Sequence, residues 1–324
     1  MKHIFIVNPI SGKSDATVYL IPKIHEMARA QGLDYAVHVT EKAGHATSLA
    51  QQYGASGDAV RLYACGGDGT LNEVLMGAYP YANLEVASVP CGSGNDFVRC
   101  FGTPEDFLNL VDNCNGAAIP IDLISANGTI SAAICSVGID SEVVYGIPKF
   151  RRIPFCGGKT AYNLSILQCL LRPIGRKMRV TIDDKVIEGT FLLATICNGK
   201  TYGGGYKASP DADLQDGILE VILVKKISRF RIAQVLSLYK NGQHIEHEAV
   251  IPKMQDIMTY DKAKKVVIAL ADGHPAIINI DGECTCVDSL TAQVLPLAAK
   301  FVLPASLYAA FQGKKCATAS AGSI

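Results

Sequence analysis

Residues 60–73, VRLYACGGDGTLNE, join a short apolar run, a cluster of glycines and the start of a helical pattern. The apolar run, Val60–Cys65, has the length of a buried strand. Glycine allows the positive φ angles and the close backbone approach that a sharp turn after a strand requires, and Gly66-Gly67-Asp68-Gly69 follows directly. Thr70 and Glu73 have capping-box spacing, so we expect a helix to begin at Thr70. The segment therefore predicts a strand–turn–helix unit.

The first third of the chain repeats this alternation of strand and helix. Strand patterns at 4–7, 35–40, 61–65 and 85–89 alternate with helical patterns at 18–27, 45–53 and 71–79. Pro22 lies inside the first helical pattern, which predicts a kink or a later start of that helix. The alternation favours a parallel sheet with helices on both faces, a Rossmann-like α/β domain.

From about residue 120 the strand patterns come closer together, and turn residues such as Asp183-Asp184 separate several of them. The strand patterns lie at 130–137, 178–182, 185–197, 219–224, 266–270 and 276–280. Helical stretches at 159–171 and 229–241 interrupt them. This arrangement is typical of an antiparallel β-sandwich or barrel, so we expect such a domain to follow the α/β domain.

The composition limits the classes of partner. A chain of 324 residues with 49% hydrophobic residues is long enough for two domains. Its formal net charge is zero, so we expect no nucleic-acid partner. No apolar stretch reaches the length of a membrane span, and the N-terminal one is too short for a signal peptide. We expect a cytoplasmic protein whose eleven scattered cysteines are reduced.

Three loops have the composition of a phosphate site. A helix start after Gly66–Gly69 would present free N–H groups and a positive dipole end to a polyphosphate, with Asp68 placed to handle Mg²⁺ or a proton. Pro90–Phe97 repeats this design after the next strand, and Ser93 and Asp96 again have capping-box spacing. Asn8–Ser14 follows the first strand but lacks the first glycine of a Walker A motif. An ordinary βα turn is the alternative for the first loop, but the carboxylate between its glycines favours a phosphate site. For Asn8–Ser14 alone, a solvated turn is favoured.

Taken together, these motifs resemble a known family. The segments Asn8-Pro9 with Ser11-Gly12, Gly66–Thr70 with Asn72-Glu73, and Pro90–Phe97 occur in the order and spacing of the diacylglycerol kinase catalytic family. The resemblance is to its soluble bacterial lipid kinases, which are related to sphingosine kinases. It extends over nearly the whole chain, because the C-terminal half adds Gly203–Gly205, Asp213 with Asp216-Gly217, and Asp281-Gly282-Glu283.

The resemblance implies an ATP-binding domain at residues 1–122, a lipid-binding domain at 123–295 and a return to the first domain at 296–312. It implies a general base at Glu283 and a structural Mg²⁺ site at Asp213, Asp216 and the backbone carbonyl of Ile218. The positions that would contact ATP are Asn8, Thr40, Gly66, Gly67, Asp68, Gly69, Thr70, Leu71, Asn72, Ser93 and Asn95.

The function that the resemblance implies is transfer of the γ-phosphate of ATP to a hydroxyl of diacylglycerol or a similar lipid, with Mg²⁺ present. A carboxylate near the acceptor hydroxyl would take its proton, and Asp68 and Glu283 are the two candidates. Asp281-Gly282 is also compatible with a plain hairpin turn. An NAD kinase and a non-catalytic lipid-binding protein are the alternatives, but the Pro90–Phe97 motif favours the lipid branch.

A lipid kinase without a spanning helix has to reach its substrate at a membrane surface. Lys149–Phe155 combines three cations with apolar residues, and an apolar helical pattern follows at 159–172. Each cation near an anionic bilayer contributes about 1 kcal/mol of attraction. We expect this region to dock on the inner face of the membrane, although a basic loop beside a core helix is equally compatible with it. The oligomeric state stays open, with a homodimer among the alternatives.

Overall fold

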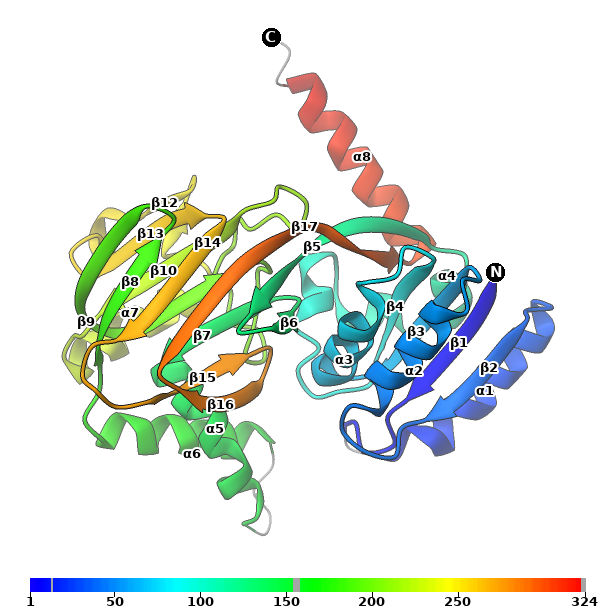
Figure 1. Ribbon diagram of the computed structural model, residues 1–324, viewed down its shortest axis with the longest axis horizontal. Coiled ribbons are helices and arrows are strands. Elements are labelled where there is room, and N and C mark those ends of the chain that lie inside the picture. The colour runs from blue at the N-terminus through cyan, green and yellow to red at the C-terminus, as the bar shows by residue number, and fades with distance from the viewer. Residues whose placement is uncertain (13, 154–157, 322–324) are drawn as a thin grey trace. The chain divides into compact units, whose positions relative to one another are not determined.

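The computed structural model describes residues 1–12, 14–153 and 158–321. The chain forms two compact units, Met1–Ile121 with Leu297–Ile324, and Asp122–Pro296. It passes from unit 1 to unit 2 within strand β5 (Ala117–Ala126) and returns within strand β17 (Ser289–Leu303) (Figure 1).

Unit 1 is built on a parallel sheet with the strand order β17–β4–β3–β1–β2. Strands β1, β3 and β4 are buried along almost their whole length, which is why their sequences are continuous apolar runs. The predicted parallel α/β domain is confirmed. Its elements are β1 (Lys2–Val7), α1 (Ala16–Ala30), β2 (Tyr35–Val39), α2 (His45–Ala55), β3 (Val60–Gly66), α3 (Asp68–Ala78), β4 (Leu84–Pro90), η1 (Phe97–Cys100), η2 (Pro104–Phe107), α4 (Leu110–Cys114) and α8 (Ala305–Ala321).

Helix α1 differs from its prediction at Pro22. The helix begins at Ala16, where the Asp15 carboxylate accepts a hydrogen bond from the N–H of Thr17, and it continues through Pro22. Of the two predicted alternatives, the later start is therefore wrong, and the kink stays a prediction. Proline removes the hydrogen bond to the carbonyl four residues earlier, which is that of Val18, and its ring crowds that carbonyl. Because Val18 is 73% exposed, water can replace that bond.

Unit 2 is an antiparallel β-sandwich whose two layers share the long strand β9 (Lys185–Cys197). The first half of β9 pairs with β8, in a layer that continues through β14, β17, β5 and β6. Its second half pairs with β7 and β10, in a layer that continues to β15, β16 and β13. The bounds are β6 (Thr129–Ser131), β7 (Ile134–Gly138), β8 (Arg176–Ile182), β10 (Leu219–Lys225), β13 (Met258–Ala263), β14 (Lys265–Leu270), β15 (Ala276–Ile280) and β16 (Glu283–Val287).

The apolar faces of these strands form the core of unit 2, with Val180, Ile196, Val221 and Ile268 among its fully buried members. The predicted antiparallel sandwich is confirmed. Two small elements follow helix α7 (Arg229–Lys240), the hairpin of β11 (Ile245–Glu246) and β12 (Ala249–Val250) and the short helix η3 (Pro252–Met254).

The single strand predicted over residues 130–137 is wrong, because the structure divides it into β6 and β7. The backbone N–H groups of Ala132, Ala133 and Ile134 donate to the carboxylate of Asp281. Ala132 and Ala133 therefore leave the strand pattern, although their sequence is apolar and strand-like.

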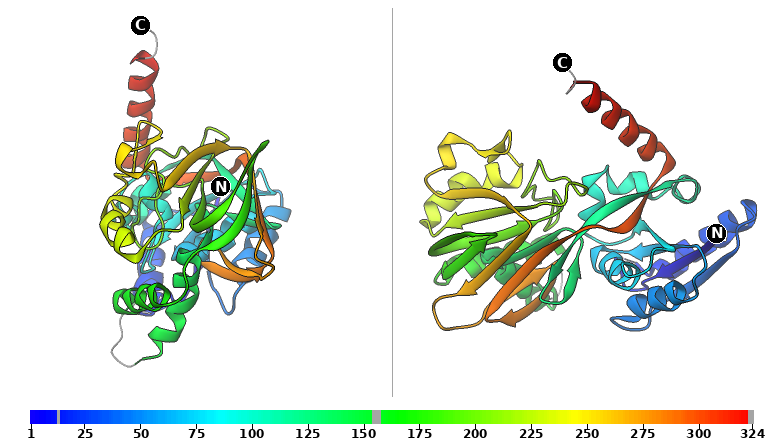
Figure 2. Two further views of the ribbon diagram at one scale, coloured as in Figure 1. Left: turned by 90° about the vertical axis from the view of Figure 1, so that its left-hand side faces the viewer. Right: turned by 45° about the horizontal axis from the view of Figure 1, so that its top comes forward.

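The described part of unit 2 contains three α-helices: α5 (Ile139–Arg151), α6 (Gly158–Leu171) and α7 (Arg229–Lys240). Helices α5 and α6 pack side by side, and α5 also packs on β7 and β15 (Figure 2). The cations Lys149 and Arg151 lie in the last turn of α5, so this part of the expected basic loop is helical. Pro154 and Phe155 lie outside the described residues. Among the described helices, none combines the length and the hydropathy that a membrane span requires.

Candidate active site

Three loops of unit 1 meet at the carboxyl ends of β1, β3 and β4. The N–H of Asn8 donates to the carbonyl of Cys65 (3.0 Å), and the N–H of Cys91 donates to the carbonyl of Gly66 (2.8 Å). The side-chain amide of Asn8 donates to the hydroxyl of Thr70 (3.0 Å). The structure therefore brings together the loops that the sequence singled out, as expected for neighbouring parallel strands.

Two glycines in these loops leave no room for a side chain. A Cβ on Gly92 would lie 2.5 Å from the Cα of Gly67, and a Cβ on Gly12 would lie 2.3 Å from the carbonyl oxygen of Cys91. Both obstacles are backbone atoms, so no rotamer change relieves the clash. The backbone of the three loops is thus packed directly together, and an anionic ligand at this edge would meet main-chain groups.

Helix α3 begins two residues earlier than predicted. Gly67 is its N-cap residue, Asp68 is its first residue, and Thr70 is buried within it. The predicted capping box is wrong because the Glu73 carboxylate accepts hydrogen bonds from the N–H groups of Gly44 (3.0 Å) and Ala46 (3.2 Å), at the start of α2. Since α3 has no side-chain cap, its first-turn N–H groups keep the positive potential that attracts a phosphate.

Asp68 lies between its own loop and the Pro90–Phe97 loop. Its Oδ1 accepts a hydrogen bond from the N–H of Phe97 (3.1 Å), and its Oδ2 lies 3.1 Å from the position of a Cβ on Gly94. The side chain is half-buried. Asp68 therefore holds the two phosphate-type loops together and is close to any ligand that they bind.

The second capping box, at Ser93 and Asp96, is also wrong. Asp96 rather than Ser93 is the N-cap residue of the 3₁₀ helix η1, and Ser93 is exposed in the loop. Asp96 is 8% exposed, and its Oδ1 lies 3.7 Å from Nε of Arg99. The sequence did not predict Asp96 as a site residue; its signals there are its place in the second glycine loop and its spacing from Ser93.

The remaining predicted ATP contacts occupy different environments. The N–H of Thr40 donates to the carbonyl of Val7 (2.9 Å), so Thr40 lies at the same sheet edge. The side-chain amide of Asn95 makes two hydrogen bonds to the backbone of Gly92 and holds the loop in shape. Leu71 is 3% exposed, so its side chain belongs to the core, whereas Asn72 and Gly69 are more accessible.

In unit 2, Glu283 is the first residue of β16 and follows a two-residue hairpin turn. Asp281 and Gly282 both have positive φ angles, 46° and 96°, as in the turns that join tightly connected antiparallel strands. The alternative interpretation of Asp281-Gly282 as a hairpin turn is thus confirmed for the backbone. The Glu283 side chain is exposed, so its carboxylate is accessible to a substrate.

The loop expected to bind Mg²⁺ is held by its own carboxylates. Asp213 accepts from the N–H of Gln215 and Asp216 from the N–H of Ile218, each at 3.0 Å. Burial raises the pKa of Asp216, and the negative charges of Asp213 and Asp122 raise it further. Asp122 is fully buried and accepts from the N–H of Gly217 (2.7 Å), a role that its apolar sequence surroundings did not indicate.

These carboxylate oxygens are the donors that Mg²⁺ prefers, and a cation would relieve their mutual repulsion, so the residues fit the ion chemically. Within the described part of the chain, however, no three His, Cys, Asp or Glu side chains converge on one metal position.

Unit 2 also contains an apolar cavity of about 110 Å³. Its walls are mainly apolar side chains of α5, α6, α7, β9 and β10. Asp140, Tyr202 and Tyr239 add polar groups, and the two tyrosine hydroxyls lie 3.3 Å apart. Asp140 is half-buried as a residue, but its Oδ2 is buried, and this burial raises the pKa of the carboxyl to about 6. Such a cavity suits an apolar ligand.

Two family models match successive parts of the chain. The model of the diacylglycerol kinase catalytic domain matches residues 2–126, and that of the YegS C-terminal NAD kinase beta sandwich-like domain matches residues 133–303. The diacylglycerol kinase of Bacillus subtilis (strain 168) is 31% identical over 283 residues, covering 86% of this chain and 88% of its own. That of Staphylococcus carnosus (strain TM300) is 30% identical over 280 residues, covering 86% and 87%.

A solved structure of a diacylglycerol kinase from Bacillus anthracis str. Sterne superposes with a TM-score of 0.66 at 20% identity, covering 94% of this chain and 98% of that one. At this identity the superposition establishes the fold. The family models and the curated relatives confirm the resemblance that the motifs indicated. The chain belongs to the diacylglycerol kinase family of ATP-dependent lipid kinases.

Proposed function

We propose that the protein transfers the γ-phosphate of ATP to the hydroxyl of diacylglycerol or a closely similar lipid. The observation that carries this proposal is the convergence of the loops after β1, β3 and β4 on one edge of the unit 1 sheet. The names of the curated relatives and the apolar cavity of unit 2 support a lipid acceptor.

Unit 1 is the ATP-binding domain in this proposal. The backbone of Gly66, Gly67 and Gly69 and the start of α3 bind the phosphates, where N–H groups and the helix dipole stabilise negative charge. Asp68 orients the two glycine loops around the triphosphate. The other proposed contacts are Asn8, Thr40, Thr70, Leu71, Asn72, Ser93 and Asn95, with Leu71 contributing its backbone.

Unit 2 is the lipid-binding domain, and Glu283 is the proposed general base. The carboxylate takes the proton of the lipid hydroxyl while the hydroxyl oxygen attacks the γ-phosphorus and ADP leaves. Glu283 suits this role because it is exposed and follows a rigid turn. Asp68 is the alternative base. The apolar cavity takes acyl chain, and Asp140 and the two tyrosines provide polar groups beside it.

The residues Asp213, Asp216 and the carbonyl of Ile218 would hold a structural Mg²⁺. The bound ion supplies positive charge that offsets the repulsion among the carboxylates of this loop. These residues would then keep the loop in one conformation beside Asp122 of β5, which already holds Gly217.

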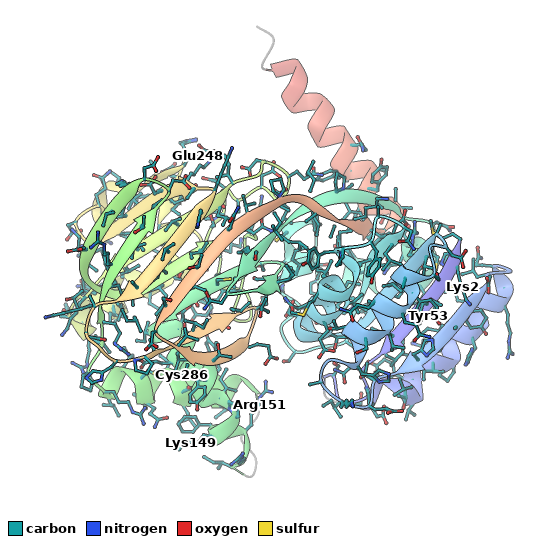
Figure 3. All side chains as sticks on the ribbon, viewed as in Figure 1. Lys2, Tyr53, Lys149, Arg151, Glu248 and Cys286 are labelled. Carbon is teal, nitrogen blue, oxygen red and sulfur yellow. The ribbon has the colours of Figure 1, made fainter. Side chains whose placement is uncertain are left out.

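We also propose that the protein is peripheral at the inner face of the membrane. Lys149 and Arg151 lie together at the end of α5 (Figure 3). Leu167, Leu171 and Phe230 are exposed apolar side chains on α6 and α7, the helices that also line the cavity. Cations beside exposed apolar groups are attracted to an anionic bilayer, which brings the cavity-lining helices to the lipid.

The decisive experiment supplies labelled ATP with vesicles that contain diacylglycerol or other hydroxylated lipids, and with NAD in a separate reaction. We expect diacylglycerol to be phosphorylated, and Glu283→Gln to lower kcat by about 100-fold or more without changing the KM for ATP. Glu188→Gln, an exposed glutamate on β9, is the control for the charge change. Phosphorylation of NAD alone would overturn the proposal, and an active Glu283→Gln variant would assign the base to Asp68.

The membrane proposal has its own measurement, flotation with anionic vesicles. We expect Arg151→Glu with Arg152→Glu to reduce the bound fraction, because both side chains are exposed and the substitutions reverse their charge. Unchanged binding would reject this docking surface.

A further inference from the structure

Three hairpins of unit 2 are held in place by the same kind of side-chain hydrogen bond. The first residue of each two-residue turn has a positive φ angle near 47°, and its side chain accepts hydrogen bonds from the backbone of a neighbouring segment. These residues are Asn127 between β5 and β6, Asp183 between β8 and β9, and Asp281 between β15 and β16. In each hairpin the side chain ties the turn to a segment that lies elsewhere in the sequence.

The tie made by Asp281 is the most extensive of the three. Asp183 accepts from two consecutive N–H groups, those of Lys264 (3.1 Å) and Lys265 (2.9 Å). Asp281 accepts from three consecutive N–H groups, at 3.1 Å for Ala133 and 2.9 Å for Ile134, and its own N–H donates to the carbonyl of Ile134 (3.0 Å). Hydrogen bonds to a carboxylate are stronger than those between neutral groups. The β15–β16 turn is therefore firmly held at Asp281.

A second side chain holds the same turn from within the unit. Asn279 is 2% exposed, and its Oδ1 accepts from the N–H of Gly282 (2.8 Å). Its Nδ2 lies 3.5 Å from the hydroxyl of Ser136. The two residues that precede Glu283 are thus both fixed through their backbone, Asp281 by the segment before β7 and Gly282 by Asn279.

We propose that Asp281 and Asn279 are positioning residues that fix the Cα of Glu283 and so aim its carboxylate at the lipid hydroxyl. This inference rests on the proposed role of Glu283 as the general base. The Glu283 side chain is exposed, so its own packing does little to hold it, and its reach depends on where the turn places its backbone. A shift of about 1 Å in a catalytic group costs about 100-fold in rate.

The test compares the same substitution in two equivalent turns. In Asp281→Asn and Asp183→Asn the new side chain tolerates the positive φ angle, as Asn127 does in the third hairpin, but it offers one acceptor oxygen in place of two. We expect Asp281→Asn to lower kcat between about 10-fold and 100-fold with an unchanged KM for ATP. We expect both variants to lose thermal stability to a similar extent, and Asp183→Asn to keep the parental kcat. Equal kcat values for the two variants would overturn the inference.

A double variant separates positioning from a general loss of structure. If Asp281 acts through Glu283, Asp281→Asn combined with Glu283→Gln has the kcat of Glu283→Gln alone. A further loss in the double variant would show that Asp281 acts elsewhere and would overturn the inference. A Glu283→Gln variant with the parental kcat would overturn the base role first and the positioning role with it. A slow Glu283→Gln beside a fully active Asp281→Asn would overturn the positioning role alone.

Asn279 provides an independent check. Asn279→Asp keeps an oxygen for the N–H of Gly282, whereas Asn279→Ala does not. We expect the kcat of Asn279→Asp to exceed that of Asn279→Ala by about 10-fold. Equal kcat values in two folded variants would contradict the inference for Asn279.

Discussion

The two units hold their functional segments in place by different kinds of contact. In unit 1 the loops of the proposed ATP site pack backbone against backbone, with Gly92 against Gly67 and Gly12 against Cys91. In unit 2 carboxylates hold the functional turns, Asp281 at the β15–β16 hairpin and Asp122 at Gly217. We therefore expect that adding a Cβ to a loop glycine displaces the loops of unit 1. In unit 2 we expect that replacing a carboxylate oxygen loosens the turns that it holds.

This difference follows from the two kinds of sheet. Parallel strands end at a common edge, so the sheet itself brings their loops together. Small residues let the backbones approach, and side chains such as Asp68 then join neighbouring loops. The hairpins of an antiparallel sandwich lie at separate ends of strands, and a turn that must hold a fixed position needs contacts from another segment. The polar residues that make these contacts in unit 2 lie far away in the sequence, as Asp281 and Ile134 do.

The largest expected effect comes from adding a methyl group to the contact between the unit 1 loops. In Gly92→Ala the new Cβ would lie 2.5 Å from the Cα of Gly67 and 2.9 Å from Oδ1 of Asn95, so the loops must separate. We expect nucleotide affinity and kcat/KM to fall by about 100-fold or more, because the phosphate-binding groups are displaced. Equilibrium nucleotide binding and steady-state kinetics measure both quantities.

Gly313→Ala on α8 is the control, because a Cβ at this position meets no atom within 4 Å. A Gly92→Ala variant with parental nucleotide affinity would show that close backbone packing is not what organises the unit 1 site.

The second prediction concerns the buried carboxyl of Asp140 in unit 2. Burial raises its pKa to about 6, so the native state keeps this proton more tightly than the unfolded state does. The resulting loss of stability develops as the pH rises from the unfolded pKa, near 4, through about 6, and it persists above that range. We expect Asp140→Asn to raise the free energy of unfolding by up to about 3 kcal/mol at neutral pH.

Urea unfolding at about pH 7.5 and about pH 4.5 measures this dependence. The gain should shrink at the lower pH, because the native state then holds the proton and the pH is close to the unfolded pKa. A gain of the same size at both pH values would mean that the carboxyl is not desolvated by the apolar cavity.

The smallest expected effect tests a side-chain tie within unit 1. Glu73→Gln replaces the carboxylate that accepts hydrogen bonds from Gly44 and Ala46 at the start of α2. The loss of the charge beside the helix N-terminus should cost about 1 kcal/mol of unfolding free energy. Urea unfolding should show a lower midpoint with an unchanged slope. The exposed Glu26→Gln on α1 is the control, and equal midpoints for the two variants would contradict the capping role of Glu73.

Much of the architecture could be predicted from local patterns. The strand and helix periodicities placed β9 and β15 at their observed bounds, and the glycine loops predicted turns after β3 and β4. Two of the errors occur where a side chain bonds to a distant segment. Thr70 and Glu73 have capping-box spacing, yet Glu73 caps α2, and the strand predicted over 130–137 is interrupted by the carboxylate of Asp281.

The sequence by itself determined the order of the two domains and the glycine loops, because periodicity and the steric freedom of glycine act over a few neighbouring residues. Only the tertiary structure decided which loops meet, which helices line the cavity of unit 2, and which side chains hold the turn before Glu283. The physical reason is the short range of packing and hydrogen bonding. A carboxylate binds whichever N–H groups the fold brings within about 3 Å, and the spacing of residues along the chain does not specify them.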